Sequence, residues 1–189
     1  MVKVKLGKKL PPMAVPVVLV GANYRGKANF CTVAWTTIID DEPPLIGLVM
    51  AKNRRTKDGM VENDTFSVNI PDTKLAVKTD YCGILSGSKK DKSRVFEVFY
   101  GELKTAPLIS EAPVAVECML KDFIAFEGTD LVIGEVNEVY VEKRCLAKDK
   151  IHMSKVDPLL YAMGGGSTYH ALGKSVGQAF SIGKGYKPK

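Results

Sequence analysis

Apolar and polar residues alternate along several stretches of the chain. Residues 65–70 (TFSVNI) place an apolar side chain at every second position, and a period of two predicts a half-buried β-strand. Residues 114–120 follow the same pattern, and residues 131–143 are rich in valine with charged residues between. These two segments therefore predict long antiparallel strands.

Apolar runs in the first third of the chain predict further strands. Residues 17–22 and 30–39 are two such runs, separated by turn-forming residues at 23–26, and this arrangement predicts a β-hairpin. Residues 45–51 form another run, with two prolines before it and a basic loop after it. We expect a buried strand that ends in that loop.

Helical signals are few and short. Thr56 is placed to cap a helix that runs through Asn63. Residues 73–82 have apolar positions near helical spacing, with Asp72 or Thr73 as the cap, and predict a second short helix.

The pattern as a whole predicts a mainly β protein. It contains about six or seven strands and two or three short helices, which favours a closed or partly closed antiparallel barrel over a doubly wound sheet. With 189 residues, 46% of them apolar, the chain suits one well-buried core. We expect a single domain over residues 1–189, with an irregular C-terminal segment from about residue 157.

Positive charge is concentrated in a few loops. The chain carries 27 Lys and Arg against 21 acidic residues, a net charge of +6, with basic clusters at 52–57, 89–94 and 184–189. Clustered cations indicate an anionic partner, and compact basic loops fit a small molecule that carries phosphate. Basic residues do not interleave with aromatic ones as in nucleic-acid-binding surfaces, so a basic β-barrel that binds nucleic acid is only a remote alternative.

Cysteine and histidine usage argues against a metal site. The four cysteines are widely spaced and form neither a CxxC pair nor a zinc-like cluster: Cys31, Cys82, Cys118 and Cys145. Only His152 and His170 could add nitrogen ligands. We expect reduced cysteines and no metal in a cytoplasmic protein. Apolar runs stay short of the roughly 18 residues that a membrane span needs, so we expect no membrane association.

Residues 26–35 (GKANFCTVAW) are unusual for a strand, because Asn29 and Thr32 interrupt a β-prone run and Ala34 stays small before the only tryptophan, Trp35. A strand edge of this kind can lie against a flat ring with a polar rim. Two later loops, 52–56 and 86–92, offer cations and hydroxyls suited to phosphate.

The order of these motifs resembles the flavin reductase-like family, and most closely its flavoredoxin branch. The motifs that carry the resemblance are LVGANYRGKANFCTVAW at 19–35, Pro43-Pro44, RRT at 54–56, FSVNIP at 66–71, DYCGILSGSKKDK at 80–92, IGEV at 133–136 and Tyr169 with Leu172-Gly173. The resemblance implies a six-stranded antiparallel Greek-key split barrel. It also implies a homodimer that binds FMN noncovalently near the subunit interface.

The resemblance further assigns site residues. The ring-side positions are Asn29, Thr32, Val33, Ala34 and Trp35. The phosphate and ribityl positions are Arg54, Thr56, Ser86, Asp91 and Lys92. Tyr169 matches a late tyrosine that approaches the flavin, and His170 is a weak catalytic candidate.

The implied function is flavin redox chemistry. In the first interpretation the protein is an oxidoreductase that takes a hydride from NAD(P)H onto FMN and passes electrons to flavin, ferric iron or a redox partner protein. In the alternative it is a flavoredoxin-type electron-transfer protein that does not oxidise NAD(P)H directly. Relatives that use a nicotinamide cofactor often carry a histidine just before IGEV, where this chain has Gly128-Thr129-Asp130.

Overall fold

A curved antiparallel sheet of seven strands forms the body of the protein in the computed structural model, which describes residues 1–188. The strands lie in the order β3-β2-β6-β9-β10-β5-β4. They are β2 (Val18–Tyr24), β3 (Lys27–Val33), β4 (Thr36–Asp41), β5 (Pro44–Ala51), β6 (Thr65–Ile70), β9 (Val114–Ala125) and β10 (Thr129–Val141). The expected six strands become seven, because the predicted strand over 30–39 is divided at Ala34-Trp35 into β3 and β4.

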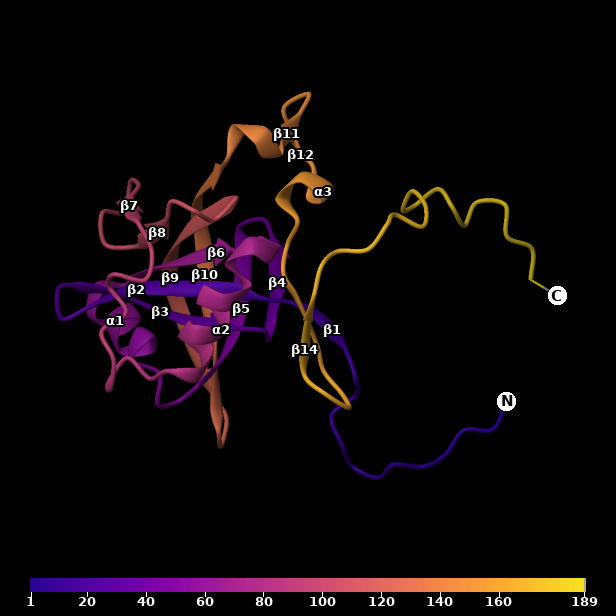
Figure 1. Cartoon of the computed structure of the whole chain (residues 1–189), viewed down its shortest axis with the longest axis horizontal. Helices are drawn as coiled ribbons and strands as arrows, with labels where there is room; N and C mark the ends of the chain where they lie inside the picture. Colours follow the sequence, from indigo (N-terminus) through magenta and orange to yellow (C-terminus); the bar gives the residue numbers. More distant parts are fainter. Residues whose placement is uncertain (189) are drawn as a thin grey trace.

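Smaller elements surround this sheet (Figure 1). Three short sheets are formed by β1 (Ala14–Pro16), β13 (Leu160–Ala162) and β14 (Thr168–His170), by β7 (Val98–Tyr100) and β8 (Pro107–Ile109), and by β11 (Leu146–Ala147) and β12 (Lys150–Ile151). The helices are α1 (Arg55–Asn63), α2 (Ala76–Ile84) and α3 (Met153–Val156), with 3₁₀ turns η1 (Thr73–Leu75) and η2 (Lys143–Cys145).

Strands β3 and β4 are consecutive in the chain yet stand at opposite ends of the sheet order. The sheet curls so that the link between them meets β5, where the Val49 amide donates to the Trp35 carbonyl at 2.8 Å. The barrel is therefore split beside Ala34 and Trp35. This opening leaves Ala34 half-buried and Trp35 exposed, directly after the buried end of β3.

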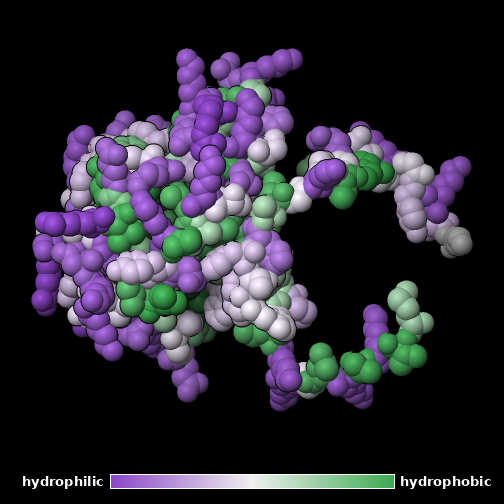
Figure 2. Space-filling model, viewed as in Figure 1, coloured by the Kyte–Doolittle hydropathy of each residue, from purple (hydrophilic) through white to green (hydrophobic). Residues whose placement is uncertain are grey.

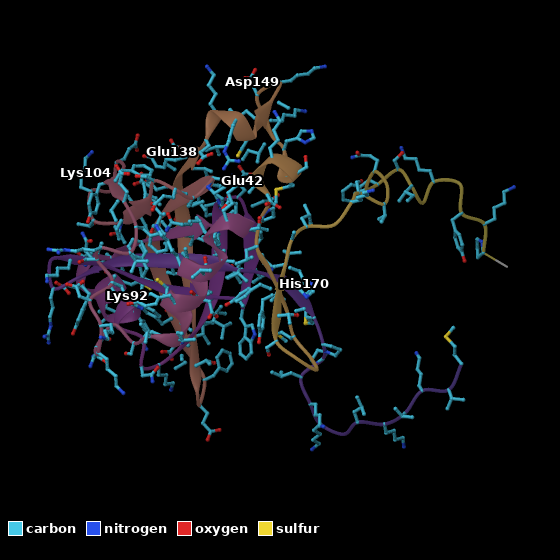
Figure 3. The ribbon with its side chains drawn as sticks, viewed as in Figure 1. Glu42, Lys92, Lys104, Glu138, Asp149 and His170 are labelled. Carbon is cyan, nitrogen blue, oxygen red and sulfur yellow. The ribbon has the colours of Figure 1, made fainter. Side chains whose placement is uncertain are left out.

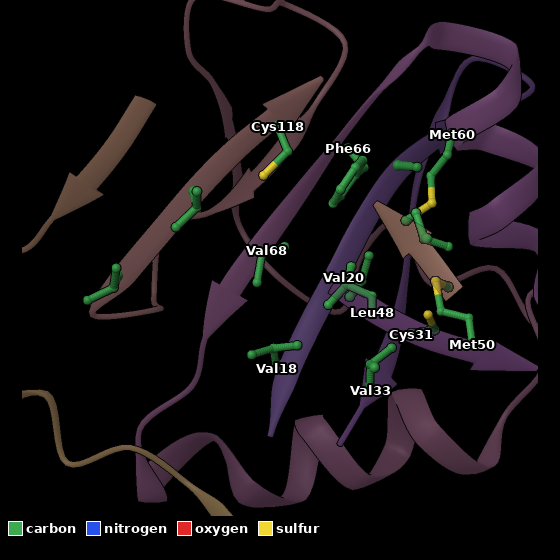
Figure 4. Close-up of a cluster of buried hydrophobic side chains, with 14 of the residues drawn as sticks. Val18, Val20, Cys31, Val33, Leu48, Met50, Met60, Phe66, Val68 and Cys118 are labelled. Carbon is green, nitrogen blue, oxygen red and sulfur yellow. The ribbon is translucent and has the colours of Figure 1, made fainter. Parts of the chain in front are cut away.

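The core fills the inside of the curved sheet. Alternate residues of neighbouring strands meet there, among them Phe66, Leu48 and Cys118 (Figure 4), and all three are fully buried. This arrangement explains the alternation in the sequence, because one face of each strand is turned inward. A second cluster around Phe30 lies under α2 and the loop that contains Phe96.

The prediction of a mainly β split barrel is confirmed. The expectation of irregular structure from about residue 157 is wrong for residues 160–162 and 168–170, which form β13 and β14. The alternation was hard to detect there because these strands have only three residues each. They form a small separate sheet with β1, in which β13 pairs with both β1 and β14, and they do not join the main sheet. The irregular segment begins after His170.

Candidate functional site

Residues at the end of β3 form the common wall of two adjoining cavities. One cavity, of about 170 Å³, lies between Cys31–Trp35 and the segment from Val49 to Arg54. The other, of about 330 Å³, is lined by Thr32 and Ala34 together with residues of α2 and the β13–β14 hairpin. The wall between them is a short extended segment with one exposed aromatic residue, since Trp35 is 43% exposed.

Thr32 and Val33 anchor this wall. The Thr32 hydroxyl donates to the Thr79 carbonyl on α2, and Val33 is buried in the core. Ala34 is half-buried and lines both cavities. The backbone of the wall is therefore held in place while its small side chains leave room for a flat ligand.

The N-terminus of α1 points into the same region. The helix begins at Arg55, and no side chain caps its first amides at the N-cap residue Arg54. The prediction that Thr56 caps this helix is wrong: Thr56 lies within the first turn, and its buried hydroxyl accepts a hydrogen bond of 2.8 Å from the Asn29 side-chain amide. Uncapped amides at a helix N-terminus favour an anion.

Lys92 is a buried cation. It is only 2% exposed, and its ammonium donates to the carbonyls of Leu85 at 3.1 Å and Cys82 at 3.4 Å. Both carbonyls belong to the C-terminal turn of α2, where the helix dipole is negative. Carbonyl groups orient the ammonium but do not neutralise it.

Arg54 approaches the same helix end from the other side. Its guanidinium donates to the Gly83 carbonyl at 3.1 Å. Within residues 1–188, neither Arg54 nor Lys92 has a carboxylate within ion-pairing distance. Burial, and to a smaller extent the charge of Arg54, lowers the pKa of Lys92. A bound anion would relieve both effects.

The loop from Ser86 to Lys92 closes over Asn29. A Cβ added to Gly87 would stand 2.5 Å from the Asn29 side-chain oxygen, so the close approach of the two depends on glycine. Ser86 hydrogen-bonds to Ser88 at 2.8 Å. A further cavity, of about 370 Å³ and lined by Asn29 and Lys92, lies beside this loop.

Asp91 does not pair with Lys92, its neighbour in the sequence. Its carboxylate accepts from the Ser93 amide at 2.9 Å and pairs with Lys27 at 3.1 Å. Hydrogen bonds from Ser93 and the pairing with Lys27 hold the pKa of Asp91 below its usual range. The carboxylate therefore shapes the loop and does not compensate the buried lysine.

The β13–β14 hairpin faces the second cavity. The Tyr169 hydroxyl donates to Asp80 of α2 at 3.0 Å, and burial together with Asp80 raises the pKa of Tyr169 to about 12. His170, the next residue along β14, is exposed, pairs with Thr168 at 2.7 Å and lines neither cavity (Figure 3). The phenol of Tyr169 is thus positioned at the site, and the His170 side chain lies outside it.

The structure brings most of the predicted residues into one region. These residues line the cavities or bond to groups that do: Asn29, Thr32, Val33, Ala34, Trp35, Arg54, Thr56, Ser86, Asp91, Lys92 and Tyr169. Sequence reasoning missed Asp80, Gly83 and Gly87. The SGSK loop was a visible signal for Gly87, whereas Asp80 and Gly83 give no local signal, because their roles depend on where α2 packs.

Asp130 belongs to the segment before IGEV, where the resemblance to nicotinamide-using relatives implied a histidine. It is buried, forms an ion pair with Lys57 of α1 and stands opposite Met50 in β5. Met50 lines the smaller cavity. The carboxylate is therefore close to the site but already paired.

Cys31 lies in the wall segment and is buried, and burial raises the pKa of its thiol. A raised pKa keeps the thiol protonated and unreactive. Across residues 1–188, no group of three or more His, Cys, Asp or Glu side chains is arranged to hold a metal ion. In the same range, none of the helices is both long and apolar enough to cross a bilayer.

A split barrel with this site defines a class of redox proteins, and comparison with known proteins identifies the family. Residues 10–170 match the Flavin reductase like domain, so the chain belongs to that family, and the predicted family membership is confirmed.

Two flavoredoxins have similar solved structures. The flavoredoxin from Methanosarcina acetivorans is 40% identical, with a TM-score of 0.93 over 97% of this chain and 98% of that one. The flavoredoxin of Desulfovibrio vulgaris (Miyazaki F) is 34% identical, with a TM-score of 0.88 over 97% and 100% of the two chains. Because each match covers 97% of this chain, it includes most of the residues at both ends.

A relative known from sequence is more distant. An uncharacterized protein of Aeropyrum pernix is 32% identical over 129 residues, which are 67% of this chain and 49% of that protein. The chain thus matches about half the length of that relative. Together the comparisons support a flavin-related redox role for the family fold.

Proposed function

We propose that the chain binds FMN noncovalently, with the ring along Thr32–Trp35 and the phosphate between Arg54, Lys92 and the N-terminus of α1. The observation that carries this proposal is the pair of cations held only by carbonyl oxygens. A buried ammonium with neutral partners is costly, and a phosphate dianion offsets that cost.

The surrounding groups suit the rest of the ligand. Asn29, which lines the cavity beside Lys92, presents a side-chain amide, and its partner Thr56 presents a hydroxyl. These neutral groups match the hydroxyls of a ribityl chain. The cavities on either side of the Thr32–Trp35 wall are narrow and partly apolar, as a planar aromatic ring requires. The match to solved flavoredoxins supports the same cofactor.

When bound, FMN supplies reversible transfer of two electrons and a proton. The residues of the chain bind and orient it. Arg54 and Lys92 hold the anionic end, and the Tyr169–Asp80 hydrogen bond holds the β13–β14 hairpin beside the ring-side cavity. Trp35 leaves the opposite side accessible because it is partly exposed.

A titration of the flavin-free protein with FMN and with riboflavin tests the phosphate site. Riboflavin lacks the phosphate, so we expect it to bind about 100-fold more weakly, as charge-assisted bonds to buried cations are among the strongest in proteins. Replacing Lys92 by Met should remove most of the difference between the two ligands. The matched control, Lys74→Met, changes an exposed lysine that lines none of these cavities and should preserve the difference.

Two redox roles follow for the bound flavin. In the first, a reduced nicotinamide donor passes a hydride to FMN, and the electrons continue to free flavin, ferric iron or a redox partner protein. In the second, the protein carries electrons between redox proteins and does not oxidise NAD(P)H. The ion pair of Asp130 with Lys57 favours the second role, because the position near the site lacks a free group able to orient a nicotinamide.

Anaerobic mixing with NADH or NADPH separates these roles. Rapid loss of the visible flavin absorbance would establish direct nicotinamide oxidation. Slow or absent bleaching, with ready reduction by dithionite, would leave the carrier role. Asp130→His offers a further test, since gain of nicotinamide-dependent bleaching would show that this position controls the reaction. A protein that takes up no flavin would refute both roles.

A further inference from the structure

A further cavity of about 330 Å³, which we call the apolar cavity, lies beside the proposed flavin wall. It is lined by Trp35 and Val49 of the barrel and by Leu10, Met13 and Met163 of the segments outside it. Among residues 1–188, none of those that line it has a charged side chain. The cavity therefore offers burial to an uncharged ligand and no partner to an ion.

Backbone hydrogen bonds hold the outer wall of this cavity in place. Strand β1 pairs with β13, with Val15 opposite Tyr161, and the Met163 amide donates to the Met13 carbonyl at 2.7 Å. In Figure 2 the chain before this wall extends away from the barrel, so the residues that close the cavity are those from Leu10 onward. The cavity is therefore largely formed before a ligand arrives, as small-molecule sites usually are.

The apolar cavity adjoins the ring end of the proposed flavin site. Ala34, Trp35 and Val49 line both this cavity and the smaller ring-side cavity. Arg54 and Lys92, which form the proposed phosphate end, do not line it. A molecule in the apolar cavity would therefore contact the wall along which the flavin ring is proposed to lie, and it would stay clear of the charged end.

The lining of the cavity favours an aromatic ligand. Trp35 is 43% exposed and Met13 is 51% exposed, so a ligand that covers them removes apolar surface from water. Indole rings stack with other rings, and thioethers such as those of Met13 and Met163 make favourable contacts with aromatic rings. Thr36, which is half-buried and also lines the cavity, adds a hydroxyl able to donate to a carbonyl oxygen. The volume suits a molecule of two fused rings rather than a dinucleotide.

We propose that the apolar cavity binds an uncharged aromatic quinone of about two fused rings, and that this quinone is the electron acceptor of the reduced flavin. The binding part rests on the cavity alone, whereas the acceptor part rests on the proposed function. The quinone takes up a hydride from N5 of the reduced flavin and a proton from water. The N5–H bond breaks, O–H bonds form on the two quinone oxygens, and the products are a hydroquinone and oxidised flavin.

Fluorescence of the flavin-free protein tests binding directly, because Trp35 is the only tryptophan of the chain and lines the cavity. Menadione, an uncharged two-ring quinone, should quench the indole emission to a saturating limit, beyond the collisional quenching of free tryptophan. A naphthoquinone sulfonate with the same two rings should bind at least about 10-fold more weakly, because the cavity offers its charge no partner. Quenching that rises without limit, or equal affinity for both quinones, would overturn the proposed binding.

A matched pair of variants tests whether the quinone binds in this cavity. Met13→Asp places a charge in the cavity wall and should raise the menadione dissociation constant by at least about 10-fold. Met153→Asp is the control, because Met153 is 49% exposed, much like Met13, and does not line the cavity. Met13 lies outside the strands of the main sheet, so its substitution leaves the barrel core intact. Equal dissociation constants in the two variants would refute the cavity as the binding site.

Reoxidation of the flavin tests the acceptor role. FMN-loaded protein, reduced anaerobically with a single equivalent of dithionite, is mixed with menadione, and the return of the visible flavin absorbance is followed. The rate should saturate with menadione, and at low menadione it should fall by about 10-fold in Met13→Asp and not in Met153→Asp. A rate that is linear in menadione and equal in the two variants would overturn the acceptor role.

This inference and the proposed function fail in different measurements. Saturable quenching of Trp35 in a protein that takes up no FMN would refute the proposed function, and with it the acceptor role, while supporting the binding of the quinone. FMN uptake without saturable quenching of Trp35 would refute this inference alone.

Discussion

The two ends of the candidate flavin site are built from different kinds of contact. At the phosphate end, Lys92 and Arg54 are fixed by carbonyl groups of α2, and Lys92 is withdrawn from water. At the ring end, Trp35 is partly exposed, and Tyr169 belongs to a short hairpin outside the main sheet. From this difference we infer that affinity and reactivity are served by separate parts of the proposed site: the buried charged end would hold the ligand, and the open end would leave its reactive ring accessible.

The largest loss of FMN affinity should come from a substitution at the proposed phosphate end. Lys92→Met removes the buried charge and should weaken FMN binding by about 100-fold, or roughly 2.7 kcal/mol. The free energy of unfolding of the flavin-free protein should change little or rise, because an uncompensated buried cation is lost. Urea denaturation measures it. If the flavin-free variant is strongly destabilised and the affinity is kept, Lys92 is only a cap of α2.

The pH dependence of binding should follow the same lysine. Burial lowers the pKa of Lys92 from its ordinary 10.5, so as pH rises the free protein loses this proton before an exposed lysine would. FMN affinity should therefore fall as pH rises, beginning below pH 10.5. Stability should change in the opposite direction. The unfolded chain binds the Lys92 proton more tightly than the flavin-free folded protein does, so the unfolding free energy should rise with pH between the lowered pKa and 10.5. Titrations at several pH values should show the affinity loss in the parent and not in Lys92→Met.

A smaller loss of FMN affinity is expected from a change where the 86–92 loop contacts Asn29 of β3. Gly87→Ala would force a methyl group to within 2.5 Å of the Asn29 side chain, which should lower the unfolding free energy by about 1–3 kcal/mol and FMN affinity by about tenfold. Gly165→Ala is the matched control, because an added Cβ there meets no atom within 4 Å. Thermal unfolding and flavin titration measure both. If the two variants have the same stability and the same FMN affinity, the 86–92 loop shifts away from Asn29 without cost, and the predicted clash is refuted.

The ring end should give the smallest effect on affinity. Tyr169→Phe removes one hydrogen bond to Asp80 and should change FMN affinity by no more than about threefold, while the rate of flavin release rises. Tyr100→Phe, which loses a hydrogen bond to Asn23 on another part of the barrel, is the control. Stopped-flow displacement of FMN measures the release rates. A loss of affinity as large as that of Lys92→Met would contradict the division between the two ends.

Local patterns predicted the elements well where each strand turns one face to the core. Residues 65–70 form β6 with the bounds that the alternation indicated. The apolar run at 45–51 is β5, extended by one residue to Pro44. The break of the 30–39 segment at Ala34-Trp35 was not predicted, because a barrel opening depends on how the whole sheet curls and not on the residues at the break.

The sequence by itself determined the alternating strands, the basic loops and the family to which their order belongs. It did so because strand periodicity and loop charge are properties of neighbouring residues. The tertiary structure alone decided the partners: the Asn29 amide meets Thr56, 27 positions away, Arg54 meets Gly83, 29 positions away, and Tyr169 meets Asp80, 89 positions away. It also showed that Lys92 is buried with only neutral acceptors. Such contacts depend on where helices pack against the folded sheet, which the local pattern of a sequence does not encode.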